Sequence, residues 1–433
     1  MHFEAPILLY GAGREAVSTR SFLARQQPQL RVYVTADNGQ ADIADTHFIP
    51  PEDIDGAIAA QKFGHIVKSP GVSRYKPVFD VAERAGITVT SNLNLWGASF
   101  RQDRSVIAIT GTKGKSTTAT LVHLMLTESG IHAGLGGNVG VAPLDMADAY
   151  PVVVLELSSY QTADMNFLPD IAAITNLYPE HVDWHGSVGQ YYKDKLHLIN
   201  REGPIRIALG AAAQTNSLVL AALGGTDRLL PRLSDEQRRI VNDAIDSSRL
   251  KGGHNRDNAQ LAAQIALGAG ATIEGVVAGI EAFMPLPHRL EEHRISDLTF
   301  VNDSISTTPE ATKAALAAYP NRKIALIAGG HEREQDYDEL ASLLDSRGVT
   351  VLVCLPVTGD RLAVATSNVG ARVEIIRATD LEAAMQALAD RDDFDTIILS
   401  PGAPSYNQFK NFEERGKRFI DLAHQLFDDR VKS

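Results

Sequence analysis

The sequence of 433 residues has one cysteine, Cys354, and no long apolar run. A single cysteine excludes an internal disulfide and fits a reducing compartment. No segment approaches the ~20 consecutive apolar residues of a transmembrane helix, and the N-terminal residues MHFEAPILLYGAG lack the basic and apolar regions of a signal peptide. We therefore expect a cytoplasmic protein without membrane insertion.

The sequence also has no excess of positive charge. Lys and Arg number 41 against 53 Asp and Glu, which gives a formal net charge of −12. A protein that binds nucleic acid through its phosphate backbone needs basic residues in excess. We therefore expect small-molecule ligands at local sites and no nucleic acid.

What the sequence does contain is a repeated alternation of apolar strands and helices, which predicts an α/β fold with mostly parallel sheets. The length suggests about three domains. We expect a Rossmann-like domain over residues 1–93, a central P-loop-type ATPase domain over residues 94–287 and a second Rossmann-like domain over residues 288–433. Residues 211–250 are polar, and we expect them to be irregular.

A glycine-rich loop, GTKGKST, lies between an apolar strand and a helix expected over residues 117–129. Gly111 and Gly114 permit a turn that directs backbone N–H groups toward an anion at the positive end of the helix. Lys115 would neutralise phosphate charge, and the Ser116 hydroxyl would hold Mg²⁺. The motif is shorter than the strict Walker A pattern. We nevertheless predict a nucleotide phosphate site formed by Gly111, Thr112, Lys113, Gly114, Lys115, Ser116 and Thr117.

A second glycine turn, GAGREA, begins at Gly11. It resembles the start of a dinucleotide fingerprint, but Ala16 stands at the third glycine position and Thr35, not an acid, ends the next strand. Hydride transfer is therefore not expected. A plain strand-to-helix turn and a site for another phosphate-bearing ligand both stay open.

Polar residues follow two further strands of the central segment. Glu156 ends the strand VVVLEL, and a charged residue there indicates a metal ligand if this strand neighbours the phosphate loop. His181 and Asp183 lie in the next loop, NLYPEHVDWHG, where the crowding of histidines and acids favours a functional site. Lys195 lies on the helix after that loop, and taken alone it is typical of a surface lysine.

Together these motifs resemble those of the Mur ligase family, in the MurD-type branch. The matching stretches are GTKGKST, GGNVG, LELSSYQ, NLYPEHVDWHG, YYKDKL, GGHNRDN, PHRLE, VNDSISTTPEAT and LSPGAPSYNQFKNFEERG, in family order along nearly the whole chain. The resemblance implies an ATP- and Mg²⁺-dependent ligase of peptidoglycan precursor synthesis. Such an enzyme adds glutamate to UDP-N-acetylmuramoyl-L-alanine through an acyl phosphate, and we expect it to be a monomer.

The resemblance also implies roles for individual residues. The expected catalytic residues are Lys115, Asn138, Glu156, His181 and Lys195. One Mg²⁺ would lie on Ser116 and Glu156, and a second on His181 and a carbamylated Lys195. ATP would also contact Asn258, His288, Arg289 and Asp303. The UDP-sugar would contact Gly11, Gly13, Arg14, Ser69, Pro70, Gly71 and Asn92, and glutamate would contact Thr307, Arg333, Ser405 and the backbone near Phe412.

Some features depart from the family pattern or have a second interpretation. A lysine expected in the glutamate pocket is Ile305, and Thr35 and Asp37 do not match the expected uridine contacts. Thr307 and Glu310 also have the spacing of a capping box, so Thr307 is alternatively a helix cap.

Other functions stay open as well. We expect D-glutamate as the substrate, with L-glutamate as the alternative. Folylpolyglutamate synthase and cyanophycin synthetase are weaker fits within the same chemistry. A non-catalytic paralogue and a nucleotide-binding switch belong to other classes, and the switch would predict a strict Walker A loop.

Overall fold

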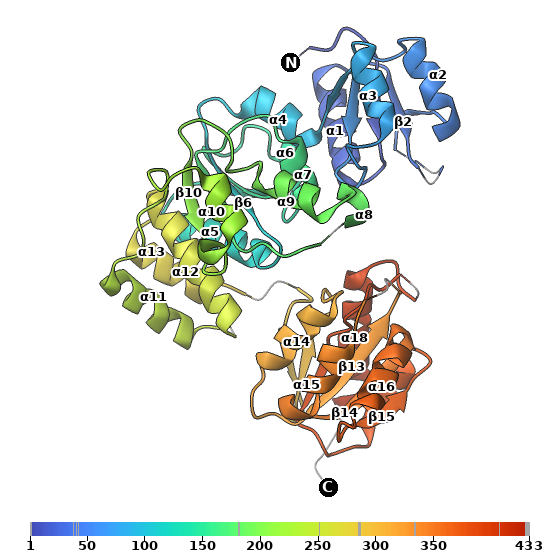
Figure 1. Cartoon of the computed structure of the whole chain (residues 1–433), viewed down its shortest axis with the longest axis vertical. Coiled ribbons are helices and arrows are strands. Elements are labelled where there is room, and N and C mark those ends of the chain that lie inside the picture. Colours follow the sequence, from blue (N-terminus) through green and yellow to red (C-terminus); the bar gives the residue numbers. More distant parts are fainter. Residues whose placement is uncertain are drawn as a thin grey trace. The chain divides into compact units, whose positions relative to one another are not determined.

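The computed structural model describes residues 2–37, 39, 41, 43–180, 182–250, 252–284, 287–332, 335–406 and 408–428. The chain forms two compact units, Met1–Leu250 with His254–Phe283, and Lys251–Gly253 with Met284–Ser433 (Figure 1). None of the helices in the described ranges has the length and apolar character needed to cross a bilayer.

The first unit begins with a parallel five-stranded sheet. Its strands in the order β3-β2-β1-β4-β5 are His47–Phe48, Val32–Thr35, Ile7–Tyr10, His65–Lys68 and Thr88–Thr90. The helices of this part are α1 (Arg14–Gln26), η1 (Pro51–Asp53), α2 (Ile54–Ala59) and α3 (Pro77–Arg84). The turn from β1 into α1 and the loop after β4 therefore meet at the carboxyl edge of the sheet, where α/β proteins bind ligands.

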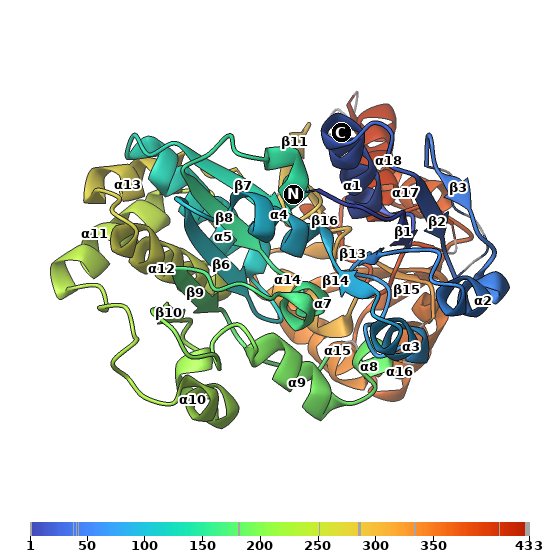
Figure 2. The same ribbon diagram turned by 90° about the horizontal axis from the view of Figure 1, so that it is seen from above.

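A second parallel sheet completes the first unit. Its strands in the order β10-β9-β6-β8-β7 are Arg206–Leu209, Ile171–Ile174, Ser105–Thr110, Val152–Glu156 and Ala133–Gly137. Figure 2 shows β6, β8 and β7 side by side. The helices are α4 (Asn92–Phe100), α5 (Lys115–Glu128), α6 (Pro143–Met146), α7 (Ser159–Asp164), α8 (Val182–His185), α9 (Val188–Leu196), η2 (Ala213–Thr215), α10 (Ser217–Leu223), α11 (Asp235–Ser247), α12 (Gly253–Gly268) and α13 (Ile273–Glu281).

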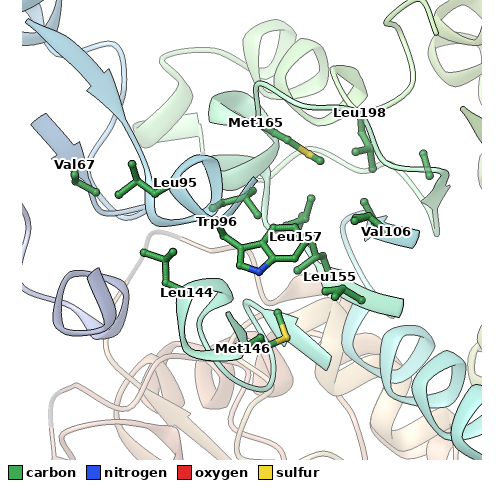
Figure 3. Close-up of a cluster of buried hydrophobic side chains, with 14 of the residues drawn as sticks. Val67, Leu95, Trp96, Val106, Leu144, Met146, Leu155, Leu157, Met165 and Leu198 are labelled. Atoms are coloured by element: carbon green, nitrogen blue, oxygen red, sulfur yellow. The ribbon is translucent and has the colours of Figure 1, made fainter. Parts of the chain in front are cut away.

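One hydrophobic core joins these two sheets. Trp96 of α4 is fully buried in it, between Val67 of the first sheet and Val106 and Leu155 of the second (Figure 3). The indole Nε1 donates a hydrogen bond to the carbonyl of Ala147 at 3.0 Å, so the buried polar atom is satisfied. The opposite face of the second sheet packs on α5, α11, α12 and α13 in a separate core.

The expectation that residues 211–250 are irregular is wrong, because α10 and α11 lie there. Helix α11 begins with a capping box, in which the Ser234 side chain accepts from the backbone of Gln237 and the Gln237 side chain accepts from the backbone of Ser234. Val241 and Ile245 of this helix pack on the second sheet's core.

The second unit contains a six-stranded sheet. Its strands in the order β11-β12-β16-β13-β14-β15 are Glu291–Ile295, Leu298–Asn302, Thr396–Leu399, Ile324–Gly330, Val349–Val357 and Glu374–Arg377. Only the β11–β12 pair is antiparallel. The helices are α14 (Pro309–Ala317), α15 (Asp338–Leu343), η3 (Asp345–Arg347), α16 (Thr358–Asn368), α17 (Leu381–Ala389) and α18 (Phe412–Phe427). The predicted α/β class with mostly parallel sheets is thus confirmed, while the domain limits at 93 and 287 stay predictions.

Candidate active site

The phosphate loop connects β6 with α5, and its two glycines adopt left-handed conformations. Gly111 has φ +145° and Gly114 has φ +79°. A Cβ on Gly111 would lie 1.8 Å from Thr175 Oγ1, and one on Gly114 would lie 2.3 Å from Asn258 Oδ1, so both positions require glycine. Gly114 is the N-cap of α5. The helix therefore begins at Lys115, two residues earlier than predicted, and its first turn presents backbone N–H groups to an anion.

The two lysines of this loop have different partners. Lys113 Nζ forms an ion pair with Glu180 at 2.6 Å, whereas Lys115 Nζ donates to the carbonyl of Thr112 at 2.9 Å. Lys115 is the first residue of α5, at the positive end of the helix where an anion would bind. The side chains of Thr112 and Thr117 are buried, so these two predicted contacts can meet a nucleotide only through their backbone.

Three predicted catalytic or metal-binding residues converge beside the loop. Strand β8 pairs with β6, with Glu156 opposite Ile109, as the prediction for Glu156 required. Ser116 Oγ donates to Glu156 Oε2 and Asn138 Nδ2 donates to Glu156 Oε1, each at 3.2 Å. Glu156 is fully buried. A buried carboxylate next to a hydroxyl at a phosphate loop fits Mg²⁺, which prefers oxygen ligands.

Arg14 fixes the loop that bears Asn138. Its Nη2 donates to the carbonyls of Gly137 at 2.8 Å and Asn138 at 3.2 Å, and its Nη1 donates to the carbonyl of Gly140 at 3.0 Å. Arg14 was predicted as a UDP-sugar contact, but its guanidinium is directed at these carbonyls. It therefore holds the turn after β1 against the loop that supplies the amide partner of Glu156.

Lys195 extends from α9 to the phosphate loop and is 2% exposed, so the alternative of a surface lysine is wrong. Its Nζ donates to the carbonyl of Gly111 at 2.6 Å and lies 5.1 Å from the centre of the Tyr191 ring. Burial, followed by the nearby charge of Lys115, lowers the pKa of Lys195 well below its ordinary value. The neutral amine favoured in this way is a nucleophile, whereas an ammonium is only a hydrogen-bond donor.

His181, the other predicted ligand of the second metal, lies outside the described residues. Asp183 and His185 follow it on α8. Over the ranges that the structure describes, no three His, Cys, Asp or Glu side chains converge as a metal site.

A buried hydrogen-bond network includes Asp194, the residue before Lys195 on α9. His185 Nδ1 is 2.6 Å from Asp194 Oδ2, and His185 Nε2 is 2.9 Å from Ser159 Oγ. This is the order of groups in a serine hydrolase triad, but Ser159 is only 1% exposed. Because a substrate cannot reach its hydroxyl, the network cannot supply a nucleophile in this conformation.

The residues predicted for the UDP-sugar partly converge at the first sheet. A Cβ on Gly11 would lie 2.7 Å from Ser69 Oγ, so the two predicted loops touch. Ser69 Oγ is buried and has no hydrogen-bond partner in the described part of the chain. Gly13, Pro70 and Gly71 belong to the same two loops.

Asn92 differs from these residues, because it is 1% exposed. Its Nδ2 donates to Glu15 O, Ser18 Oγ and Thr19 Oγ1 at 3.0–3.2 Å, and its Oδ1 accepts from Leu144 N at 3.2 Å. The amide is satisfied within the protein, so the structure favours a packing role over the predicted ligand contact.

Asp303, predicted to bind the ribose, lies in the second unit directly after β12 and is 3% exposed. Ser400 Oγ donates to its Oδ2 at 2.7 Å, and Leu290 N donates to its Oδ1 at 3.3 Å. Burial raises the pKa of Asp303 to about 6. These internal bonds favour a structural role over the predicted contact.

The two residues predicted at the domain junction lie just before β11. His288 Nδ1 accepts from Asn302 Nδ2 at 2.9 Å. The buried Nε of Arg289 has no partner within the described ranges.

Two of the predicted glutamate contacts, Thr307 and Ser405, lie on the loops that follow β12 and β16 at the carboxyl edge of the third sheet. Thr307 is half-buried and Ser405 is buried. The N-cap of α14 is Thr308, so the interpretation of Thr307 as the cap is wrong. Phe412 begins α18, and Arg333 lies outside the described residues.

Sequence reasoning missed Arg415, which joins two of these loops and is 1% exposed. Its Nε and Nη2 donate to Ser304 Oγ and O at 3.0 and 2.8 Å, and Nη2 also donates to the carbonyl of Ala403 at 3.1 Å. Burial lowers the pKa of its guanidinium to about 9. The motif FEERG contains this arginine, but nothing in its local pattern predicts burial.

Comparisons with known proteins match this arrangement. The Mur ligase middle domain matches residues 109–222, and the Mur ligase glutamate ligase domain matches residues 288–403. A UDP-N-acetylmuramoyl-L-alanine–L-glutamate ligase of Xanthomonas oryzae pv. oryzae is 35% identical over 96% of this chain and 94% of its own. A ligase of the same name from Micromonospora sp. is 37% identical over 82% of this chain and 81% of its own.

Solved structures show the same fold. The crystal structure of UDP-N-acetylmuramate-alanine ligase MurC from Thermotoga maritima superposes with a TM-score of 0.61 at 17% identity. The match covers 98% of this chain and 100% of the other.

Proposed function

This chain belongs to the Mur ligase family, and on that premise we propose that it joins L-glutamate to UDP-N-acetylmuramoyl-L-alanine. It is an ATP-dependent amino-acid ligase of peptidoglycan precursor synthesis. The observation that carries the substrate proposal is the shared name of two relatives that match most of the chain. The cytoplasm is the expected compartment.

The choice of L-glutamate differs from the expectation drawn from the sequence, which favoured D-glutamate and is not confirmed. Both relatives are named for the L enantiomer. Ile305, half-buried on the loop between β12 and α14, stands where a lysine was expected. Losing a charge-assisted hydrogen bond to a substrate carboxylate would cost about 1.5–3 kcal/mol unless another donor replaced it. A changed set of carboxylate contacts is consistent with a changed enantiomer.

The residues around the phosphate loop fit ATP and Mg²⁺. Backbone N–H groups in the first turn of α5 would hold the phosphates, and Lys115 would neutralise their charge. Glu156 and Ser116, joined by a 3.2 Å hydrogen bond, would hold Mg²⁺. The ion would supply electrostatic stabilisation while negative groups approach one another. Asn138, bonded to the other oxygen of Glu156, would orient the carboxylate and contact the substrate.

Lys195 fits a carbamylated metal ligand. In its neutral form the amine can add CO₂, and the resulting carbamate carries two oxygens and a negative charge, whereas an ammonium offers no lone pair to a metal. The proposed second site would comprise this carbamate and His181.

These groups support a two-step reaction. The carboxylate oxygen of the UDP-sugar substrate attacks the γ-phosphorus of ATP, and the bond to the β-phosphate oxygen breaks, which releases ADP. The glutamate amine then attacks the acyl carbon of the acyl phosphate. Inorganic phosphate leaves with the bonding electrons, and the nitrogen loses a proton to solvent.

ADP release in the presence of Mg²⁺ tests this proposal. We expect release to require UDP-N-acetylmuramoyl-L-alanine and glutamate together, and to fall at least tenfold when either is omitted. ATP hydrolysis without either substrate would favour a nucleotide switch. A response to a folate with glutamate would favour folylpolyglutamate synthase, and either result would contradict the proposal.

A further inference from the structure

The loop after β4, residues 69–75, connects the proposed UDP-sugar site with the segments around Lys195. Its first three residues, Ser69, Pro70 and Gly71, are predicted contacts of the UDP-sugar. Trp184 Nε1 of α8 donates to the carbonyl of Pro70 at 3.0 Å, and Ser73 Oγ donates to the carbonyl of Trp184 at 2.7 Å. The loop therefore holds α8, which begins directly after His181.

The last residue of this loop, Tyr75, contacts the helix that bears Lys195. The Tyr75 hydroxyl donates to Asp194 Oδ1 at 2.6 Å. Gln190 Nε2 donates to the same carboxylate oxygen and to the Tyr75 hydroxyl, each at 2.7 Å. The Asp194 side chain is 7% exposed, and its other oxygen pairs with His185. Both oxygens of Asp194 are thus fixed, one of them by the loop of residues 69–75.

Asp194 is the neighbour of Lys195 on α9, so its position affects where the lysine amine lies. Hydrogen bonds to a buried carboxylate are among the stronger ones in proteins, so the bonds to Asp194 hold α9 in place. In this position of α9, Lys195 Nζ lies 2.6 Å from the Gly111 carbonyl oxygen. At the other end of the loop lie the predicted sugar contacts Ser69, Pro70 and Gly71, and the buried Ser69 Oγ has no hydrogen-bond partner in the described part of the chain. A ligand bound there would restrict the loop and, through Tyr75, the helix α9.

We propose that Tyr75 and Asp194 are positioning residues that couple occupancy of the UDP-sugar site to carbamylation of Lys195. This inference rests on the proposed function. In carbamylation the lone pair of Lys195 Nζ attacks the carbon of CO₂ and forms an N–C bond. One C–O π pair moves onto oxygen, and the nitrogen loses a proton to solvent. The UDP-sugar favours carbamylation of Lys195. Because coupling is reciprocal, carbamylation tightens binding of the UDP-sugar by the same factor.

The test measures carbamate on Lys195 by ¹³C NMR in the full-length protein, titrated with ¹³C-bicarbonate and Mg²⁺ without ATP. Each titration is run with and without saturating UDP-N-acetylmuramoyl-L-alanine, and calorimetry measures binding of that substrate separately. Lys195→Ala identifies the signal. Tyr75→Phe removes only the hydroxyl that bonds Asp194. Tyr319→Phe is the matched control, because it removes a hydroxyl that donates to the carboxylate of Glu292 at 3.0 Å in the second unit.

In the wild type we expect the half-saturating bicarbonate concentration to fall about fivefold or more when the UDP-sugar is present. The effect should shrink to less than about twofold in Tyr75→Phe and persist in Tyr319→Phe. If the UDP-sugar leaves the half-saturating bicarbonate concentration of the wild type unchanged, the coupling is overturned and the proposed function stays intact. An undiminished effect in Tyr75→Phe would have the same consequence. Absence of UDP-sugar binding, or of any carbamate on Lys195, would overturn the coupling and the corresponding part of the proposed function.

Discussion

Replacing Gly114 with alanine tests the geometry of the phosphate loop. At φ +79° an L residue costs about 1–2 kcal/mol. The new Cβ would also lie 2.3 Å from Asn258 Oδ1, and Asn258 is only 7% exposed. Displacing this buried amide from its partners adds about 1–3 kcal/mol, so we expect the free energy of unfolding to fall by about 2–5 kcal/mol. ATP affinity should fall as well, since Gly114 caps the helix that faces the phosphates.

Gly130→Ala is a matched control, because Gly130 has φ +78° and no atom within 4 Å of its added Cβ. It should cost only the conformational part, about 1–2 kcal/mol. Both tryptophans, Trp96 and Trp184, lie in the first unit, so their fluorescence during urea unfolding reports on that unit. In an Asn258→Ala background the cost of Gly114→Ala should drop to the Gly130→Ala value. Equal costs for Gly114→Ala and Gly130→Ala in the wild-type background would refute the close approach of Asn258.

Three further predictions concern charged groups of the first unit. Lys115→Ala should reduce ligation below a tenth of the wild-type rate with little change in thermal stability, and higher retained turnover would contradict the role of Lys115 at the phosphates. Lys195→Ala should lose most activity, and a short-chain carboxylic acid should restore part of it by supplying the missing oxygens; full activity at limiting Mg²⁺ would show that Lys195 is not a ligand. Burial raises the pKa of Glu15 from 4.5 to about 7, so its contribution to stability is present below pH 4.5 and is lost as the pH rises through 7. Between pH 5 and pH 8 the free energy of unfolding of the wild type should therefore fall by up to about 3 kcal/mol relative to that of Glu15→Gln. The same pH dependence for both proteins in urea unfolding would refute this.

Much of the site at the carboxyl edge of the second sheet could be predicted from the sequence, because the local residue patterns and the sheet topology agree there. Glycines at 111 and 114 after an apolar strand predict an anion loop, and parallel strands bring Glu156 to the same edge. The start of α5 at Lys115 was missed because only the left-handed conformation of Gly114 sets it. The start of α11 has a local signal, the capping-box pattern of Ser234 and Gln237, but the polar composition of residues 211–250 favoured irregular structure.

The roles of buried polar residues could not be predicted in the same way. Asn92 and Asp303 occupy motif positions, yet their partners come from residues distant in sequence. Arg14 likewise bonds to carbonyls more than 120 positions away. The partners of a polar group depend on tertiary packing, which the local sequence pattern does not contain.

The most direct test of the proposed activity is ligation with each pure glutamate enantiomer, UDP-N-acetylmuramoyl-L-alanine, ATP and Mg²⁺, followed by mass detection of the product. The account predicts a kcat/KM at least tenfold higher for L-glutamate than for D-glutamate. A preference for D-glutamate would contradict the proposed specificity, and no product with either enantiomer would contradict the proposed reaction itself.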